Sequence, residues 1–388
     1  MTGFVLKSSF FCADVKFLSF CMRHTVISGK LLVIAQSARM LVQLAANAGF
    51  RAVAVDCFAD ADTRLMAVET VQVSSLALRD VQFAIDAMRQ KYGLIHVVYG
   101  SGFEKHTETL DYLEQHWTVL GNAAAKFRQF QDKPVFFSQL DRLSIQFPET
   151  VFAPPGEGND WLLKPMRGEG GSEISRYRRD MHVEDGEFYW QRRLYGRAMS
   201  VLFLASRGRV NLLGFNRQWT TAFDDDRAFV FAGIISHAEL PVDSQVQLSE
   251  WLAKLIGVYP LCGLSSLDFM LVDRECYVLE VNPRIPASAQ LYGKSIFSLH
   301  IQACLGVLGD DVSTDPTAYQ VLYAREQLVI PSEIKWPEWV VDRPIAGALI
   351  GKGEPICSII SAGKDASQVK DRLRRQRDFI ETLFRTGF

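Results

Sequence analysis

Cysteine is sparse in this chain of 388 residues, and a large net charge is absent. The seven cysteines are scattered and form no Cys-x-x-Cys pair, a pattern that disfavours a disulfide framework or a zinc site and favours a reducing cytoplasm. The formal charge of −2 argues against broad electrostatic attraction to nucleic acid or to an anionic membrane. Any binding of anions must therefore be local.

Three further features are missing. No apolar run without charges reaches the length that spans a membrane. The first predicted strand is not followed by Gly-x-Gly-x-x-Gly, which disfavours a dehydrogenase built on a dinucleotide-binding domain. The lysine of "LLKPMRGEGGS" precedes its glycines and no Gly-Lys-Ser/Thr follows, so this segment is not a P-loop.

The N-terminal residues 1–28 predict an extension that is disordered or poorly ordered. Their apolar run superficially resembles a signal peptide, but Lys7, Asp14 and Lys16 interrupt it. Met22 is an alternative start, which would leave the residues before it outside the native protein.

The hydrophobic pattern divides the remaining chain into three domains of a soluble globular protein. Residues 29–120 alternate apolar runs with helical patterns, which predicts an open α/β domain with a parallel sheet. Residues 121–315 combine helices with antiparallel-looking strands, and 316–388 predict a small β-rich domain with a terminal helix. The expected fold class is therefore α/β with α+β.

The stretch "LDFMLVDRECYVLEVNPR" (267–284) predicts a β-hairpin with an acid near each end, Asp268 and Glu280. Because side chains alternate faces along a strand, Glu280 and Asn282 share a face. A loop of three residues would place Asp268 opposite Glu280 on that face, whereas a loop of two residues would turn it away. We therefore expect an odd-length loop and a set of hard oxygen ligands suited to Mg²⁺.

An alternative remains open at this point, in which Asp268 pairs with a nearby arginine and Glu280 caps the following turn. Cationic residues favour the metal site. Arg284 is a planar cation that suits phosphate oxygens. Lys164 ends an apolar strand, where an ammonium group is costly unless an anion meets it, and three glycines follow within seven residues. Such a loop can turn N–H groups toward phosphate or form an ordinary turn.

Lys133 stands at a predicted helix start, where Pro134 favours the first turn. The segment "GSGFE" (100–104) follows a predicted strand, at the edge where open α/β sheets place ligands. Its glycines are compatible with a close approach to a ligand and with an ordinary turn.

The order of these motifs resembles the ATP-grasp superfamily of carboxylate–amine ligases. The resemblance rests on "QDKPVFFSQLDRLSIQFPET", "WLLKPMRGEGGS", "YWQRRLYGRAMSV" and the hairpin ending in "EVNPR", and it covers roughly residues 29–310. It implies an ATP-grasp fold preceded by a pre-ATP-grasp α/β domain, with ATP as the substrate and Mg²⁺, or Mn²⁺ in its place, as the cofactor.

The resemblance also implies roles for individual residues. Lys133 and Lys164 would bind the nucleotide phosphates, with Lys164 and Arg284 as the catalytic pair. The loop over the phosphates would be Gly168, Gly170, Gly171 and Ser172. The adenine linker would be Gln191, Arg192, Arg193 and Leu194. Asp268, Glu280 and Asn282 would bind the metal. Substrate contacts are predicted for Ser101, Gly102, Glu104, Arg217, Ser288 and Tyr292.

One departure concerns the ribose. The family usually carries an acid on or just after the linker, whereas here that region has Gln191, Arg192, Arg193 and later Ala198. A non-catalytic nucleotide-binding grasp protein is therefore an alternative.

The resemblance implies that a substrate carboxylate is activated as an acyl phosphate and joined to an amine. A bicarbonate-using carboxylase, or an enzyme of the carbamoyl-phosphate type, is a further alternative. The segments "VVYGSGFE", "LGN" and "EVNPRIPASAQLYG" are similar to the ATP-grasp ligases of one-carbon cofactor biosynthesis, of the methanofuran and methanopterin type. Small-molecule acids and amines are the expected partners. The protein itself is expected to be a homodimer in the cytoplasm.

Overall fold

The computed structural model describes residues 29–156, 160–224, 227–309, 312 and 314–385. The predicted extension 1–28 lies outside the described residues. No helix in the described ranges is both long enough and apolar enough to cross a membrane.

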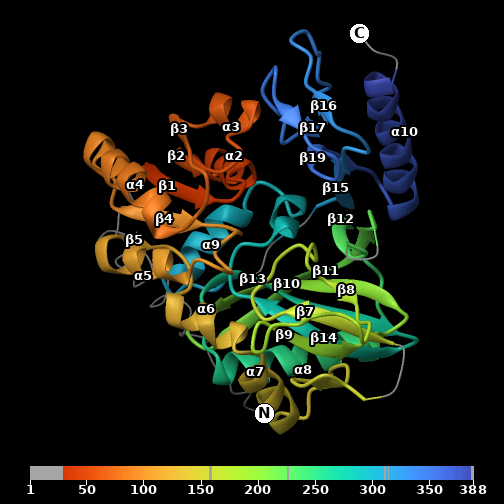
Figure 1. Cartoon of the computed structure of the whole chain (residues 1–388). Helices are drawn as coiled ribbons and strands as arrows, with labels where there is room; N and C mark the ends of the chain where they lie inside the picture. The colour runs from red at the N-terminus through yellow and green to blue at the C-terminus, as the bar shows by residue number, and fades with distance from the viewer. Residues whose placement is uncertain (1–28, 157–159, 225–226, 310–311, 313, 386–388) are drawn as a thin grey trace, which may run out of the picture.

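The first domain is a five-stranded parallel sheet in the order β3-β2-β1-β4-β5 (Figure 1). Its strands are β1 (Lys30–Ala35), β2 (Arg51–Asp56), β3 (Glu69–Gln72), β4 (His96–Tyr99) and β5 (Thr118–Val119). Its helices are α2 (Arg39–Asn47), α3 (Ala61–Met66), α4 (Leu78–Tyr92) and α5 (Thr107–His116).

Both faces of this sheet are covered. Leu31 and Val33 of β1 pack into a core with α2, whereas Leu32 and Ile34 pack into a second core with α4 and α5. Continuous apolar runs such as "LLVIA" are what a parallel sheet buried on both sides requires.

The central part of the chain contains two antiparallel sheets with helices packed against them. A four-stranded sheet has the order β6-β9-β7-β8, from β6 (Thr150–Val151), β7 (Trp161–Pro165), β8 (Ser175–Arg176) and β9 (Phe188–Arg192). The larger sheet begins with β10 (Arg197–Ser206), β11 (Arg209–Thr221), β12 (Val230–Ile235), β13 (Gly263–Val272) and β14 (Glu275–Asn282). The helices are α6 (Ala124–Gln131), α7 (Lys133–Arg142) and α8 (Val242–Val258).

The C-terminal segment extends this larger sheet, which has the order β14-β13-β10-β11-β12-β15-β19-β17. The added strands are β15 (Thr317–Tyr323), β17 (Val340–Val341) and β19 (Pro355–Ala362), while β16 (Leu328–Val329) pairs with β18 (Leu349–Ile350). Helix α10 (Ala366–Arg385) packs on β15 and β19. Residues 316–385 therefore share a sheet with the central part.

A two-residue loop connects β13 to β14, so the prediction of an odd-length loop is wrong. Val272 pairs with Glu275, and Asp273 in the loop has a φ of 53°, which tight hairpin turns require. The register then shifts between Phe269, which faces Val278, and Asp268, which faces Glu280.

Leu279 is the extra residue at this shift, which makes a β-bulge. The bulge restores the register that the short loop would have broken. Asp268 therefore lies opposite Glu280, as predicted, for a different physical reason.

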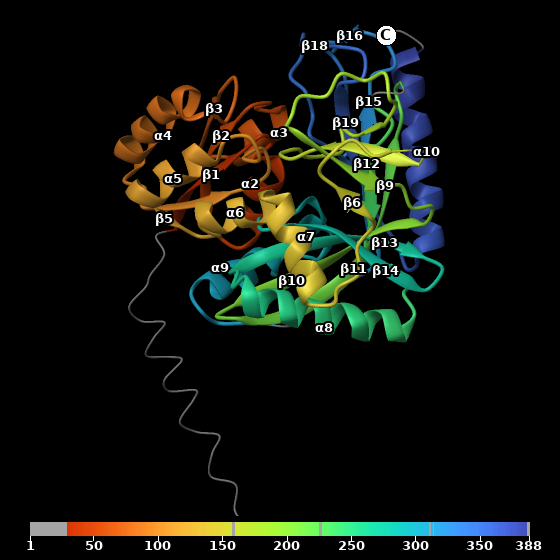
Figure 2. The same cartoon turned by 60° about the horizontal axis from the view of Figure 1, so that its bottom comes forward.

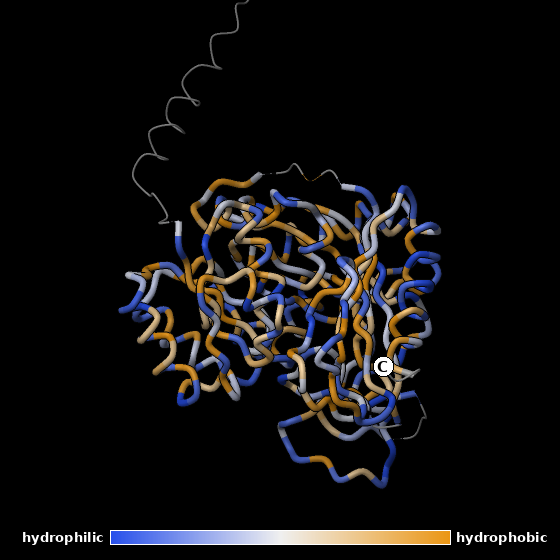
Figure 3. The backbone as a smooth tube through the Cα atoms, turned by 90° about the horizontal axis from the view of Figure 1, so that it is seen from above, coloured by the Kyte–Doolittle hydropathy of each residue, from blue (hydrophilic) through white to orange (hydrophobic). Residues whose placement is uncertain are grey.

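The opposite face of the hairpin is core. Phe269 and Val278 pack with residues of α7 and α8, and α8 lies along the sheet that contains β10 and β11 (Figure 2). In the described part of the backbone, hydrophobic stretches concentrate in the interior strands and hydrophilic ones at the periphery (Figure 3).

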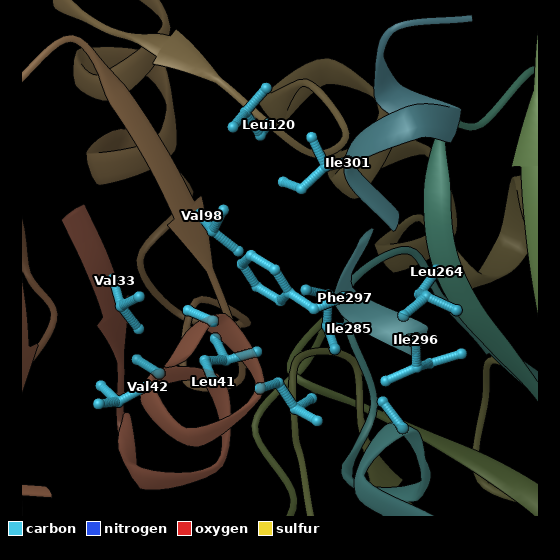
Figure 4. Packing of buried hydrophobic residues seen from close by; sticks show 14 of the residues in the cluster. Val33, Leu41, Val42, Val98, Leu120, Leu264, Ile285, Ile296, Phe297 and Ile301 are labelled. Atoms are coloured by element: carbon cyan, nitrogen blue, oxygen red, sulfur yellow. The ribbon is translucent and has the colours of Figure 1, made fainter. Parts of the chain in front are cut away.

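A second core joins the first domain to the central sheet. Val33, Leu41 and Val98 meet Leu264 and Phe297 in one buried cluster (Figure 4). Many of the residues that the central part contributes to this cluster belong to η1 (Ala287–Leu291) and α9 (Ile296–Cys304), which follow the hairpin in the sequence. The first domain is thus fixed to the segment that leaves the hairpin.

Replacing Phe269 by alanine tests the core that holds the hairpin. Phe269 is fully buried, and a Phe→Ala change in a core costs about 3–5 kcal/mol. We expect Phe269→Ala to lower the free energy of unfolding by that amount in a urea titration. Phe83→Ala is the matched control, because Phe83 is 88% exposed and surface changes stay within about 0.5 kcal/mol. Equal losses in both variants would contradict the packing described here.

Candidate active site

Two carboxylates and an amide share one face of the hairpin. Asp268 lies opposite Glu280. The Nδ2 of Asn282 donates to Asp268 Oδ2 at 3.3 Å, and the Nε2 of Gln218 donates to Asp268 Oδ1 at 3.4 Å. Lys133 Nζ lies 3.7 Å from Glu280 Oε2. The contacts of Asp268 are therefore amide groups, and the alternative pairing with an arginine is not observed among the described residues.

The electrostatics of this face fit a divalent cation. Burial, and then repulsion from Glu280, raise the pKa of Asp268 to about 7, so the neighbouring groups leave negative charge there unbalanced. No group of three or more His, Cys, Asp or Glu side chains suited to a metal occurs in the part of the chain that the structure describes. A metal at this face would combine the two carboxylates with the amide oxygen of Asn282, a set of hard ligands that suits Mg²⁺.

Two lysines lie close to the carboxylates. Asp132 caps α7 by accepting a hydrogen bond from the N–H of Val135, which sets Lys133 in the first turn. Lys164 comes from β7, is 8% exposed, and its Nζ donates to Gln191 Oε1 at 3.1 Å. Burial lowers the pKa of Lys164 to about 8, although Glu280 and Asp268 partly oppose this. Its Nζ also lies over the ring of Tyr189, 5.7 Å from the centroid. A buried ammonium with neutral partners is suited to an incoming anion.

The glycine-rich loop between β7 and β8 crosses toward β12. The N–H of Phe231 donates to Gly170 O at 2.8 Å. Gly170 and Gly171 have φ of 63° and 70°, and a Cβ at Gly171 would collide with the carbonyl of Phe229, so glycine is required there. Gly168 is also tight against Pro165, and Ser172 is exposed.

Arg284 connects this loop to the first domain. Its Nε donates to Glu104 Oε1 at 2.9 Å, and its guanidinium lies 3.9 Å from Glu169 Oε2. Both glutamates accept from the N–H of Gly102 at 3.0 Å. Burial would raise the pKa of Glu104. The charge of Arg284 and the hydrogen bonds that Glu104 makes outweigh this effect and hold that pKa below the ordinary value.

The predicted linker lies in β9 and just after it. Gln191 is buried, and its Nε2 donates to Thr150 Oγ1 at 3.0 Å. The N–H of Arg192 donates to Glu149 O and that of Arg193 to Asp160 O, both at 2.7 Å. These two N–H groups are thus already used within the protein. Leu194 follows directly, half-buried.

The predicted substrate residues are only partly brought together. Gly102 and Glu104 lie beside Arg284, and Ser101 precedes them, where its carbonyl accepts from the N–H of Gln36. Ser288 and Tyr292 are buried beyond the hairpin. The hydroxyl of Ser288 has no partner among the described residues, and that of Tyr292 donates to Asn216 Oδ1 at 2.8 Å.

Arg217 stands apart from this group. It is exposed and lies between Asn216 and Gln218 on β11, and alternation along the strand turns its side chain away from the face of Gln218. No contact of Arg217 with the other predicted substrate residues appears in the described ranges.

Sequence reasoning missed Gln218 and Glu169. Gln218 is 50 positions from Asp268, and Glu169 is 67 positions from Gly102. For Glu169, the only local signal of a functional role was its position as an acid inside a glycine-rich loop. Acids are also common in ordinary exposed turns.

Comparison with known proteins identifies the domain type. Residues 130–288 match the family described as the ATP-grasp domain. An uncharacterised protein of Methanocaldococcus jannaschii is 23% identical over 263 residues, which cover 63% of this chain and 63% of that protein. The chain thus spans less than two thirds of the length of this curated relative.

Solved structures share the fold over most of the chain. The biotin carboxylase of Campylobacter jejuni in a β,γ-ATP complex has a TM-score of 0.68 at 14% identity, over 88% of this chain and 89% of its own. The biotin carboxylase domain of Hydrogenobacter thermophilus 2-oxoglutarate carboxylase, a dimer with MgADP, ADP and bicarbonate, has a TM-score of 0.70 at 14% identity, over 89% and 88%.

The N5-carboxyaminoimidazole synthetase of Staphylococcus aureus with ADP has a TM-score of 0.66 at 16% identity, over 90% of this chain and 97% of its own. At such identities the likeness establishes the fold. The predicted mixed α/β architecture is therefore confirmed.

The acid in the glycine-rich loop predicts a pH dependence of stability. Burial, and then repulsion from Glu104, raise the pKa of Glu169 from an ordinary 4.5 to about 8. Between these values the folded state holds a proton that the unfolded state has lost, so this group destabilises the fold as pH rises. We expect the melting temperature of Glu169→Gln to be close to that of wild type near pH 4.5. As the pH rises toward 8, the melting temperature of the variant should exceed that of wild type by a growing margin. A gap that narrows as pH rises would contradict the burial of this carboxyl.

Proposed function

Because residues 130–288 form an ATP-grasp domain, we propose that the protein is an ATP- and Mg²⁺-dependent ligase that joins a substrate carboxylate to an amine. The observation that carries this proposal is the convergence of two lysines on one carboxylate face. Lys164 is buried and pairs with no acid among the described residues, and Lys133 lies 3.7 Å from Glu280. Phosphate oxygens would neutralise both cations.

The residues around the hairpin have separate roles in this proposal. Asp268, Glu280 and Asn282 would hold Mg²⁺, which supplies neutralisation of phosphate charge when bound. Lys133, Lys164 and Arg284 stabilise the charge that spreads over the transferred phosphoryl group. Gly168, Gly170, Gly171 and Ser172 cover the phosphates and exclude water. Residues 191–194 hold the base, with Leu194 offering a backbone N–H beyond those that Arg192 and Arg193 already use.

The chemistry has two steps. A carboxylate oxygen of the acid attacks the γ-phosphorus of ATP, the bond to the bridging oxygen breaks, and ADP leaves an acyl phosphate behind. The amine nitrogen then attacks the acyl carbon, the bond to the phosphate oxygen breaks, and an amide, phosphate and a proton are released. The chain supplies no covalent nucleophile in this scheme, so positioning and electrostatic stabilisation carry the catalysis.

The narrower proposal places this ligase in one-carbon cofactor biosynthesis. It rests on the similarity of "VVYGSGFE", "LGN" and "EVNPRIPASAQLYG" to such ligases. We further propose that the protein is a homodimer and is located in the cytoplasm. The Hydrogenobacter thermophilus domain is a dimer in its crystal structure. Mn²⁺ in place of Mg²⁺ belongs to the same proposal.

A bicarbonate-using carboxylase is the second candidate, because bicarbonate accompanies MgADP in one of the structures that share this fold. The two candidates differ in the acid that ATP activates. A screen for ADP release with Mg-ATP, run with bicarbonate alone and with pairs of amino acids and amines, separates them, and product mass identifies the bond formed. ADP release that requires bicarbonate would favour the carboxylase, and release that requires an acid and an amine would favour the ligase.

Replacing Lys164 by methionine tests the phosphate site. We expect ADP release to fall by about 100-fold or more, because loss of a charge aimed at the transition state has effects of this size. The fold should persist, since methionine fills a similar volume. Lys370→Met is the matched control, because Lys370 lies exposed on α10. Normal turnover in Lys164→Met would refute the assignment, and Mg-ATP binding by wild type without any ADP release would favour a non-catalytic protein.

A further inference from the structure

A pocket lies between the first domain and the glycine-rich loop. Its volume is about 360 Å³, and the side chains that matter for its chemistry are Gln36, Leu76, Glu104, Lys105, Glu169 and Glu173. A smaller pocket of about 30 Å³, lined by Lys133, Glu280 and Asn282, shares Glu104 and Gly168 with it. The larger pocket is therefore a neighbour of the face where the phosphoryl group would be transferred.

The pocket carries more acid than base. Lys105 Nζ pairs with Glu173 Oε1 at 2.7 Å near the exposed rim. At the inner end Arg284 pairs with Glu104 at 2.9 Å and is more distant from Glu169, at 3.9 Å. Two cations thus face three carboxyl groups, and two of these three, Glu104 and Glu169, lie at the inner end beside the single cation Arg284.

The inner carboxylates approach each other closely. The Oε2 atoms of Glu104 and Glu169 accept from the same N–H, that of Gly102, each at 3.0 Å. Burial of Glu169, and then this crowding by Glu104, raise its pKa. Adding a second anion here would increase the repulsion, whereas adding a cation would relieve it.

We propose that this pocket is the amine subsite of the ligase, with Glu169 and Glu104 binding the substrate amine in its ammonium form. The inference rests on the proposed function, since the reaction requires an amine next to the acyl phosphate. An ammonium group at the inner end makes charge-assisted hydrogen bonds to both carboxylates. Its nitrogen is then adjacent to Arg284 and to the smaller pocket.

The same charges restrict the class of amine. Lys105 and Arg284 are already engaged by Glu173 and Glu104, so a carboxylate next to the amino group would meet acids without a partner. The subsite therefore selects a simple cationic amine over an α-amino acid. Because Glu169 belongs to the glycine-rich loop, a bound amine also holds that loop against the first domain.

A binding experiment on the full chain tests this proposal without any turnover. The probes are 1-aminopentane, the neutral 1-pentanol, and 2-aminohexanoic acid, which is 1-aminopentane with an α-carboxylate. Each is titrated calorimetrically at millimolar concentration in the presence of a non-hydrolysable Mg-ATP analogue. We expect heat of binding for 1-aminopentane alone. Glu169→Gln should weaken this binding by about tenfold, which corresponds to about 1.4 kcal/mol.

Glu250→Gln is the matched control, because this side chain on α8 is exposed and lies outside the pocket. It should bind 1-aminopentane as wild type does. The proposal is overturned if wild type does not bind 1-aminopentane, if 2-aminohexanoic acid binds equally well, or if Glu169→Gln has no effect. Failure of the ligase proposal itself would show separately, as absence of ADP release with every acid and amine.

Discussion

The pairing of Asp268 with Glu280 across one hairpin is the constraint on which the site depends. Two carboxylates on neighbouring strands repel each other, and burial strengthens that repulsion. The bulge at Leu279 imposes this pairing despite a two-residue loop. The protein balances it incompletely, with Lys133 at 3.7 Å from Glu280 and amide groups on Asp268. The remaining deficit of positive charge is what a divalent cation would balance at this face in the proposed function.

The core on the other side of the strands stabilises this arrangement. Phe269 and Val278 are fully buried against α7 and α8, and they alternate with the residues that form the site. A slip of one residue would expose these apolar side chains and bury the acids. The hydrophobic effect on one face therefore sets the geometry of the charges on the other.

Local patterns predicted the elements better than the contacts between them. The strands and the start of α7 follow from alternation and turn chemistry. The pairing of Asp268 with Glu280 was predicted through an odd-length loop, whereas a two-residue loop together with a bulge produces it. Local patterns did not predict the bulge, although its trace is visible: buried Cys276 and Val278 keep a spacing of two, and the next buried residue is Val281. Glu169 and Gln218 meet partners 67 and 50 positions away, and no periodicity encodes such meetings. The addition of β15, β19 and β17 to the central sheet is likewise a matter of long-range pairing.

The distribution of cores also indicates which part can move. The first domain shares a buried cluster with η1 and α9, and Arg39 reinforces it through Asp342 at 2.7 Å and Gln290 at 2.9 Å. The four-stranded sheet has a much smaller cluster of its own, centred on Trp161, Leu163 and Trp190. Opening the site by moving the first domain would break a large core, whereas moving β7, β8 and their glycine-rich loop would break few apolar contacts. In the proposed function that loop would therefore control access to the phosphates, and in this structure Glu169 holds it against the first domain through the N–H of Gly102.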